Sequence, residues 1–103
     1  MPTLVKLKKM ILRAKIAIFA IEITLNKLRK EPPELVKKAS EKKAAGDKRG
    51  AVWLMLRRRG VLQRIARYEK NLKELMEAHD NWVIDIYKSR WQKEEHKEEQ
   101  MNQ

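Results

Sequence analysis

The sequence predicts an all-α protein that folds as an antiparallel hairpin of two long helical arms. Two runs of apolar residues recur at alternating steps of three and four, the repeat of a helix that packs along a partner helix. The residues that end helices are concentrated at Pro32–Pro33 and within Gly46–Gly50, and the second segment lies close to the midpoint of the chain. Because a helix rises about 1.5 Å per residue, a reversal at Gly46–Gly50 gives two arms of similar length.

The first arm is predicted to run from residue 3 to a kink at the two prolines. Its apolar stripe consists of Leu4, Leu7, Ile11, Ala14, Ile18, Ile21, Leu25 and Leu28, widened in the middle by Ile16, Phe19 and Ile23. Pro33 has no N–H to donate and Pro32 disfavours the α region at Glu31, so we expect the helix to break or kink near residue 31. A shorter helix is then expected to restart at Pro33 or Glu34.

The second arm is predicted from residue 50 to residue 90. Its apolar stripe consists of Val61, Ile65, Tyr68, Leu72, Leu75, His79, Trp82 and Ile86. Because His79 occupies a position of this stripe, we expect a histidine satisfied within the seam and not a metal ligand. Residues 1–90 are therefore predicted to form one basic hairpin domain, and residues 91–103 an acidic polar tail.

The composition argues against an enzyme and in favour of a binding protein. The 103 residues contain no cysteine, two histidines and three glycines, which leaves little material for a nucleophile, a metal site or a phosphate-binding loop. We therefore expect no catalytic residues, no metal and no cofactor. The formal charge is +11, and it is distributed unevenly: residues 1–68 carry a net +14 and residues 69–103 a net −3. A strongly basic body indicates a polyanionic partner, either nucleic acid or an anionic membrane surface.

The predicted anion-binding residues are spread over both arms and the tip. They are Lys6, Lys8, Lys9, Arg13, Lys15, Lys48, Arg49, Arg57, Arg58, Arg59, Arg64 and Arg67. Residues 32–68 hold eleven bases against three acids, so most of the acidic partners that a solvated helix face would have at i,i+4 are missing. Arginine suits phosphate because its planar fork donates two parallel hydrogen bonds. Arg57 and Arg64 are expected to share a face, whereas Arg58 falls in the register of the seam.

Tryptophans beside basic residues raise the question of base stacking, which the spacing does not favour. Trp82 lies in the apolar stripe of the second arm, and Trp53 adjoins Leu54 near the tip. Trp91 lies beyond the stripe among polar residues, where a partner contact is expected.

The N-terminal lysines flank apolar residues, the pattern of a basic amphipathic helix that lies on an anionic membrane. Leu4, Leu7 and Met10 are the residues predicted to insert. No transmembrane segment is expected, because the most apolar stretch, Ile16 to Leu25, is ten residues long and contains Glu22. Residues 1–21 contain no acid, so an organellar presequence stays open as an alternative.

One resemblance is carried by the tip and the beginning of the second arm. Residues 40–59 read SEKKAAGDKRGAVWLMLRRR, and Leu62, Ile65, Tyr68, Leu72 and Leu75 follow. This segment resembles the hairpin tip and second helix of the ESCRT-III (charged multivesicular body protein) family. The resemblance implies a cytoplasmic, membrane-peripheral subunit that polymerises on anionic membranes and remodels them. Lipid contact is then implied for the bases of the first helix and for Arg57–Arg59. Pro32–Pro33 departs from the family, whose first helix is usually continuous.

A second resemblance lies in the same region. Residues 48–62, KRGAVWLMLRRRGVL, are similar to the basic helix of a bacterial-type small-subunit ribosomal protein that clamps an rRNA junction with a helical hairpin. This implies an RNA-binding structural protein of a ribosome-like particle, in a ribosomal or organellar location. The His/Asp/Ser cluster of that family is absent, with Asp47 alone in its place. A coiled-coil adaptor that binds other proteins is the third interpretation, and the ESCRT-III-like one is placed first.

Overall fold

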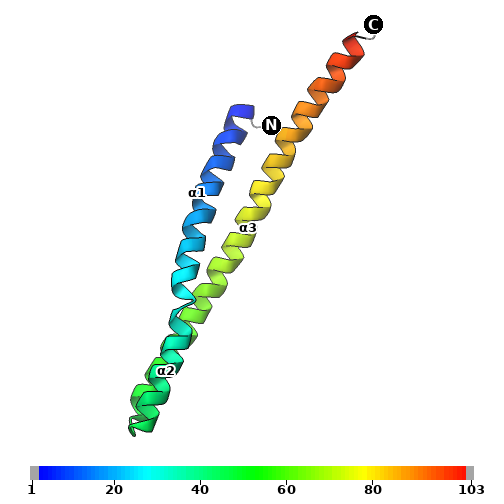
Figure 1. The fold of residues 1–103 in the computed structure, drawn as a ribbon. Helices are drawn as coiled ribbons and strands as arrows, with labels where there is room; N and C mark the ends of the chain where they lie inside the picture. The colour runs from blue at the N-terminus through cyan, green and yellow to red at the C-terminus, as the bar shows by residue number, and fades with distance from the viewer. Residues whose placement is uncertain (1–2, 102–103) are drawn as a thin grey trace. The chain divides into compact units, whose positions relative to one another are not determined.

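The computed structural model describes residues 3–101, and the side chains of residues 3–92. Three helices follow one another along the chain: α1 (Leu4–Leu28), α2 (Glu31–Ala44) and α3 (Lys48–Met101) (Figure 1). The described part of the chain contains no strand. The all-α hairpin predicted from the sequence is confirmed, with α1 and α2 as the first arm and α3 as the second.

The predicted interruption of the first arm lies at Arg29–Lys30, between α1 and α2. Prolines at positions 32 and 33 cannot donate to the carbonyls of Leu28 and Arg29, and their rings clash with those carbonyls, so α1 ends at Leu28. The new helix begins earlier than expected, at Glu31, with both prolines in its first turn. The N–H groups of the first turn of a helix have no intrahelical acceptor, so proline removes no hydrogen bond at these positions. The expectation that Pro32 keeps Glu31 out of the α region is therefore wrong.

Gly46 ends α2 at the tip. Its φ of +84° is a left-handed conformation that glycine adopts without a steric penalty. The Gly46 amide donates to the Lys43 carbonyl (3.0 Å), and the Asp47 amide donates to the Lys42 carbonyl (2.8 Å). These two bonds form a Schellman motif, which satisfies the last carbonyls of the helix.

Asp47 starts α3 immediately afterwards. Its Oδ1 accepts a hydrogen bond of 2.8 Å from the Gly50 amide, so Asp47 is the N-cap of the helix. The reversal therefore occupies residues 45–47, within the predicted tip, and Gly50 already belongs to the first turn of α3.

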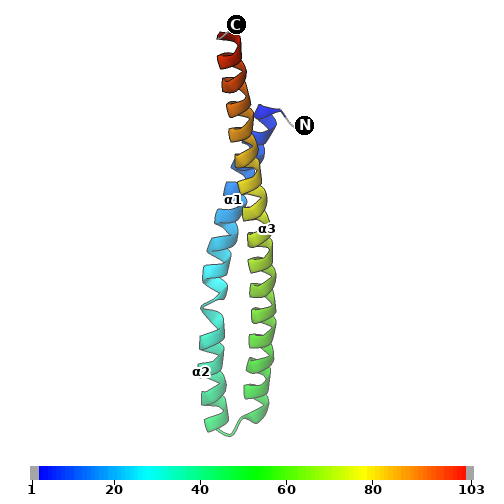
Figure 2. The ribbon, with the colours of Figure 1, turned by 90° about the vertical axis from the view of Figure 1, so that its right-hand side faces the viewer.

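The chain divides into two compact units, and one of them comprises Phe19–Lys73. Figure 2 shows α2 and the first half of α3 side by side in this unit, joined by the tip. The core consists of Leu25, Leu35, Val61 and Ile65, with Ile21, Leu28, Leu54, Tyr68 and Leu72 packed against it. The apolar stripes of the two arms therefore meet here, as the hairpin requires.

The other unit comprises Met1–Ile18 and Glu74–Gln103. Leu7 and Ala14 of α1 are buried in it, and Leu75, Trp82 and Ile86 of α3 are half-buried. Helix α3 does not end near residue 90 but continues to Met101, through the segment predicted as a polar tail. None of the described helices is both long and apolar enough to span a bilayer.

Candidate functional site

The arginine triplet Arg57–Arg59 does not form one cluster. Successive residues of a helix are rotated by about 100°, so the three side chains leave α3 on three different sides. Arg57 and Arg59 are exposed, whereas Arg58 is half-buried, and its Nε is buried without a hydrogen-bond partner. The structure therefore places Arg58 in the seam register and separates it from the predicted anion site.

Four of the predicted arginines lie on one side of α3 together with a tryptophan and a glycine. Steps of four, four, three, four and three residues connect Arg49, Trp53, Arg57, Gly60, Arg64 and Arg67, which we call the basic flank. All four arginines are exposed. Among residues 3–92, the salt bridges are Arg29–Glu69 and Lys42–Asp47, and His79 Nδ1 lies 3.2 Å from Asp80 Oδ1; none of these contacts involves the basic flank.

The basic flank has two properties that sequence reasoning missed. Trp53 is 72% exposed, so it is not a core residue near the tip. Gly60 has open space where a Cβ would lie, so nothing in the packing of the chain requires a glycine there. A glycine inside a helix costs about 0.5–1 kcal/mol relative to alanine. The available signal in the sequence was the helical spacing of Arg49, Trp53 and Arg57, which follow one another at steps of four residues.

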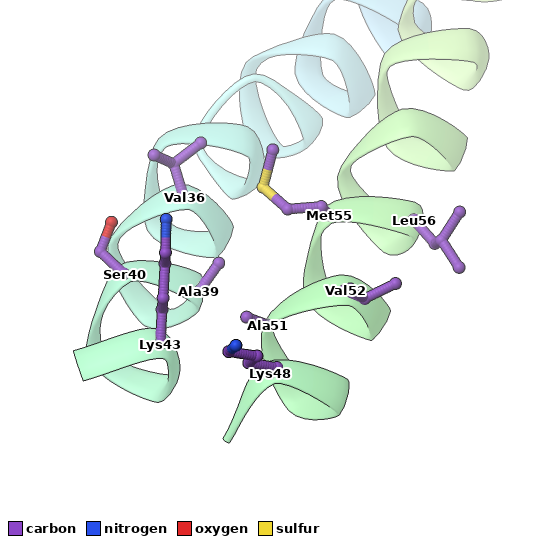
Figure 3. Close-up of a pocket in the computed structure, with 9 residues that line it drawn as sticks. All are labelled: Val36, Ala39, Ser40, Lys43, Lys48, Ala51, Val52, Met55 and Leu56. Atoms are coloured by element: carbon purple, nitrogen blue, oxygen red, sulfur yellow. The ribbon is translucent and has the colours of Figure 1, made fainter. Parts of the chain in front are cut away.

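A groove opens between α2 and α3 close to the tip, with a volume of about 640 Å³. It is lined by Val36, Ala39, Ser40, Lys43, Lys48, Ala51, Val52, Met55 and Leu56 (Figure 3). Its walls are mainly apolar, and Lys43 and Lys48 lie at the ends of the two helices that meet at the tip. Lys48 thus lines this groove, and it also lines a second hollow together with Arg49, Val52 and Trp53, at the end of the basic flank that lies near the tip.

The three residues predicted to insert into a membrane lie on the side of α1 that contains the buried Ala14. Leu7 is 7% exposed, so it is not available to lipid in this conformation, and Met10 is half-buried. Leu4 is the most accessible of the three at 37%. The reason is that they share the helix side of Ala14, which is buried.

A second apolar stripe of α1 is exposed instead. Steps of seven, four, three and four residues connect Val5, Leu12, Ile16, Phe19 and Ile23, which we call the outer stripe. Their exposed fractions range from 41% to 65%. Sequence reasoning treated three of them as a widening of the seam, although with Val5 and Leu12 they form a helical row of their own. Helix α1 therefore carries apolar rows on two opposite sides.

Basic side chains border the outer stripe on both sides. By helical position, Lys8 and Lys15 lie on one side of it and Lys9 and Lys27 on the other. The predicted residues Lys6 and Arg13 lie farther round the helix and are exposed like the others. Glu22 is the single acid within α1. The predicted N-terminal bases are thus placed beside a row of exposed apolar residues, and not beside a buried one.

The described residues offer no metal site, because no group of three or more His, Asp or Glu side chains converges among them. His79 is half-buried, with its Nδ1 3.2 Å from Asp80 Oδ1 and its Nε2 buried without a partner. The acidic residues from Glu94 onwards have side chains outside the described part of the chain.

Comparison of the chain with protein families, with curated proteins and with solved structures gave no significant match.

Proposed function

We propose that this protein is a non-enzymatic structural protein that binds anionic membrane surfaces through α1 and assembles there with further copies of itself. The observation that supports the proposal is the outer stripe: a row of exposed apolar residues along one helix, bordered by lysines. A helix of this kind lies in the membrane interface, with its apolar side in the acyl boundary and its lysines at the headgroups. The function agrees with the resemblance to the ESCRT-III family.

Electrostatic attraction and burial of apolar side chains together stabilise such membrane binding without a binding pocket. Each basic residue near an anionic surface contributes about 1 kcal/mol. Lys8, Lys9 and Lys15 therefore supply about 3 kcal/mol, and burial of Ile16 and Phe19 adds apolar stabilisation that neutral lipid alone would also provide. Strong binding is accordingly expected only where both contributions are present, on anionic membranes.

Self-assembly is supported by the uneven charge of the chain. The acidic residues 69–103 of one copy attract the basic residues 1–68 of another, and this contact favours head-to-tail growth over a closed dimer. Since the attraction acts between exposed charges, it weakens as salt is added.

Vesicle flotation tests the membrane site. The chain is mixed at low salt with phosphatidylcholine vesicles that contain or lack phosphatidylserine. Wild-type protein is expected to float with the anionic vesicles and to stay behind with the neutral ones. Ile16→Ser/Phe19→Ser should abolish flotation, because it removes the centre of the outer stripe. The matched control is Ile84→Ser/Tyr87→Ser, which removes two exposed apolar residues of α3. Equal flotation of both variants would contradict the proposal.

A coiled-coil partner is the second candidate for the same stripe, because steps of seven, four, three and four are also the heptad spacing of a helix seam. Light scattering without lipid separates the two. A monomer that binds anionic vesicles supports the membrane site. A stable oligomer that Ile16→Ser/Phe19→Ser dissociates, and that does not float, supports the helical partner.

A further inference from the structure

We infer that the basic flank of α3 is a binding surface for single-stranded nucleic acid, separate from the membrane site proposed on α1. The six residues lie in one row on one helix, inside a single compact unit. From Arg49 to Arg67 the row extends for about 27 Å along the helix axis. This is an elongated surface, and it suits a chain of phosphates better than one small anion.

Within residues 3–92, no salt bridge compensates the charges of the flank. None of the residues three or four positions from Arg49, Arg57, Arg64 or Arg67 is acidic. Arg64 and Arg67 are instead like charges at i,i+3, an arrangement that destabilises an isolated helix. Phosphate groups would relieve this repulsion and accept two hydrogen bonds from each guanidinium.

Trp53 adds an exposed aromatic side chain to the row, which binding of phosphate alone does not require. Its indole is 72% exposed and lies one helical turn from Arg49 and one from Arg57. An aromatic side chain between phosphate-binding residues is a stacking platform for an unpaired base. A duplex keeps the faces of its bases within its own stack and offers Trp53 nothing to stack on. The flank therefore fits a single strand.

Gly60 supports the same conclusion from the backbone. It lies in the row between Arg57 and Arg64, and a Cβ there would meet no atom of the protein. The absent side chain lets a ligand approach the helix backbone closely between the two arginines. Binding to a membrane surface does not require such a close approach to the backbone. Trp53 is the only apolar side chain in the row, and one apolar side chain is too few for insertion into a membrane.

Fluorescence anisotropy with the full chain tests the inference. The probes are labelled oligouridine and oligothymidine of about 16 nucleotides, the upper end of known site sizes for single-strand binding folds, and a duplex of equal length. We expect both single strands to bind more tightly than the duplex. Unequal affinity for the two single strands shows whether the 2′-hydroxyl of RNA contributes.

Trp53→Ala should weaken single-strand binding by about 5- to 150-fold, the loss that corresponds to one base–aromatic stack, and leave duplex binding unchanged. Tyr87→Ala, which removes another exposed aromatic side chain of α3, is the control and should have no such effect. Gly60→Ala should weaken single-strand binding while raising the melting temperature, which excludes misfolding as the cause.

The arginines are tested through the salt dependence. Arg57→Gln/Arg64→Gln should reduce the slope of log K against log salt by about 1.4, the contribution of two phosphate contacts to a single strand. The control Lys37→Gln/Lys38→Gln removes the same charge from exposed residues of α2 and should leave the slope unchanged.

Three outcomes overturn the inference: equal losses in the two charge variants, duplex binding at least as tight as single-strand binding, or no effect of Trp53→Ala. If Trp53→Ala and Arg57→Gln/Arg64→Gln instead reduce vesicle flotation, the flank belongs to the membrane surface. The experiment is independent of the proposed function, because vesicle flotation with the outer-stripe variant tests α1 and the anisotropy series tests α3.

Discussion

The Gly50 amide donates a hydrogen bond of 2.8 Å to Asp47 Oδ1, and a Cβ on Gly50 would collide with that same carboxylate. Asp47 caps α3 by accepting this hydrogen bond, and the absence of a Cβ at Gly50 leaves room for the capping carboxylate. This relationship explains why a glycine lies in the first turn of a helix, where its low helix propensity is a disadvantage.

A double-mutant cycle measures this fit. Asp47→Ala should lower the free energy of unfolding by about 1 kcal/mol, the usual loss of an N-cap. Gly50→Ala in the wild-type chain should bring no gain, because the displaced cap offsets the better helix propensity. In the Asp47→Ala background the same substitution should stabilise by about 0.5–1 kcal/mol. Additive effects in urea unfolding would contradict the fit.

Gly60→Ala is the matched comparison for the glycine effect, because Gly60 is also in α3 but faces open space. It should stabilise the wild-type chain by about 0.5–1 kcal/mol. Thermal unfolding followed by circular dichroism measures this gain. A loss of stability would show that a contact within the chain requires Gly60.

Gly46→Ala should destabilise the chain by about 1–2 kcal/mol. The φ of +84° at Gly46 is strained for any residue with a Cβ, although the space around it is open. Gly46→Asn should cost less, because asparagine tolerates this region better than alanine does. Urea unfolding of the two variants orders them, and equal losses would point to a cause other than the backbone conformation.

Leu25→Ala should be among the most destabilising single changes, at about 2–5 kcal/mol. Leu25 is 1% exposed and belongs to the core with Leu35, Val61 and Ile65. Ile23→Ala on the same helix is the control, since Ile23 is 41% exposed and lies on the outer stripe. It should change stability by no more than about 0.5 kcal/mol and should weaken vesicle flotation. Similar losses of stability in both variants would reject the assignment of the two stripes.

Arg58→Met should raise the free energy of unfolding by about 1 kcal/mol. The buried Nε of Arg58 has no hydrogen-bond partner, so the substitution removes an unsatisfied donor and keeps the aliphatic stem in the seam. Arg57→Met, at an exposed position, should have little effect. If Arg58→Met instead lowers the free energy of unfolding, the guanidinium group of Arg58 itself stabilises the fold, and not only the aliphatic part of the side chain.

The helices and the reversal between the arms could be predicted from the sequence because their causes are local. Rows of apolar residues at steps of three and four define α1 and α3, and Gly46 with Asp47 ends one helix and starts the next. The separation of Arg57, Arg58 and Arg59 also follows from the rotation of about 100° per residue. That signal was present in the sequence, although the three were grouped.

The tertiary structure decided which apolar residues are left for a partner. Both rows of α1 have helical spacing, and periodicity alone does not tell a buried row from an exposed one. Packing buries Leu7, Ala14 and Leu25 and leaves Ile16 and Phe19 exposed, because one side of a helix is all that a single partner helix covers. The exposure of Trp53 has the same origin. The sequence by itself determined the hairpin, and packing between its arms decided which side chains remain available for binding.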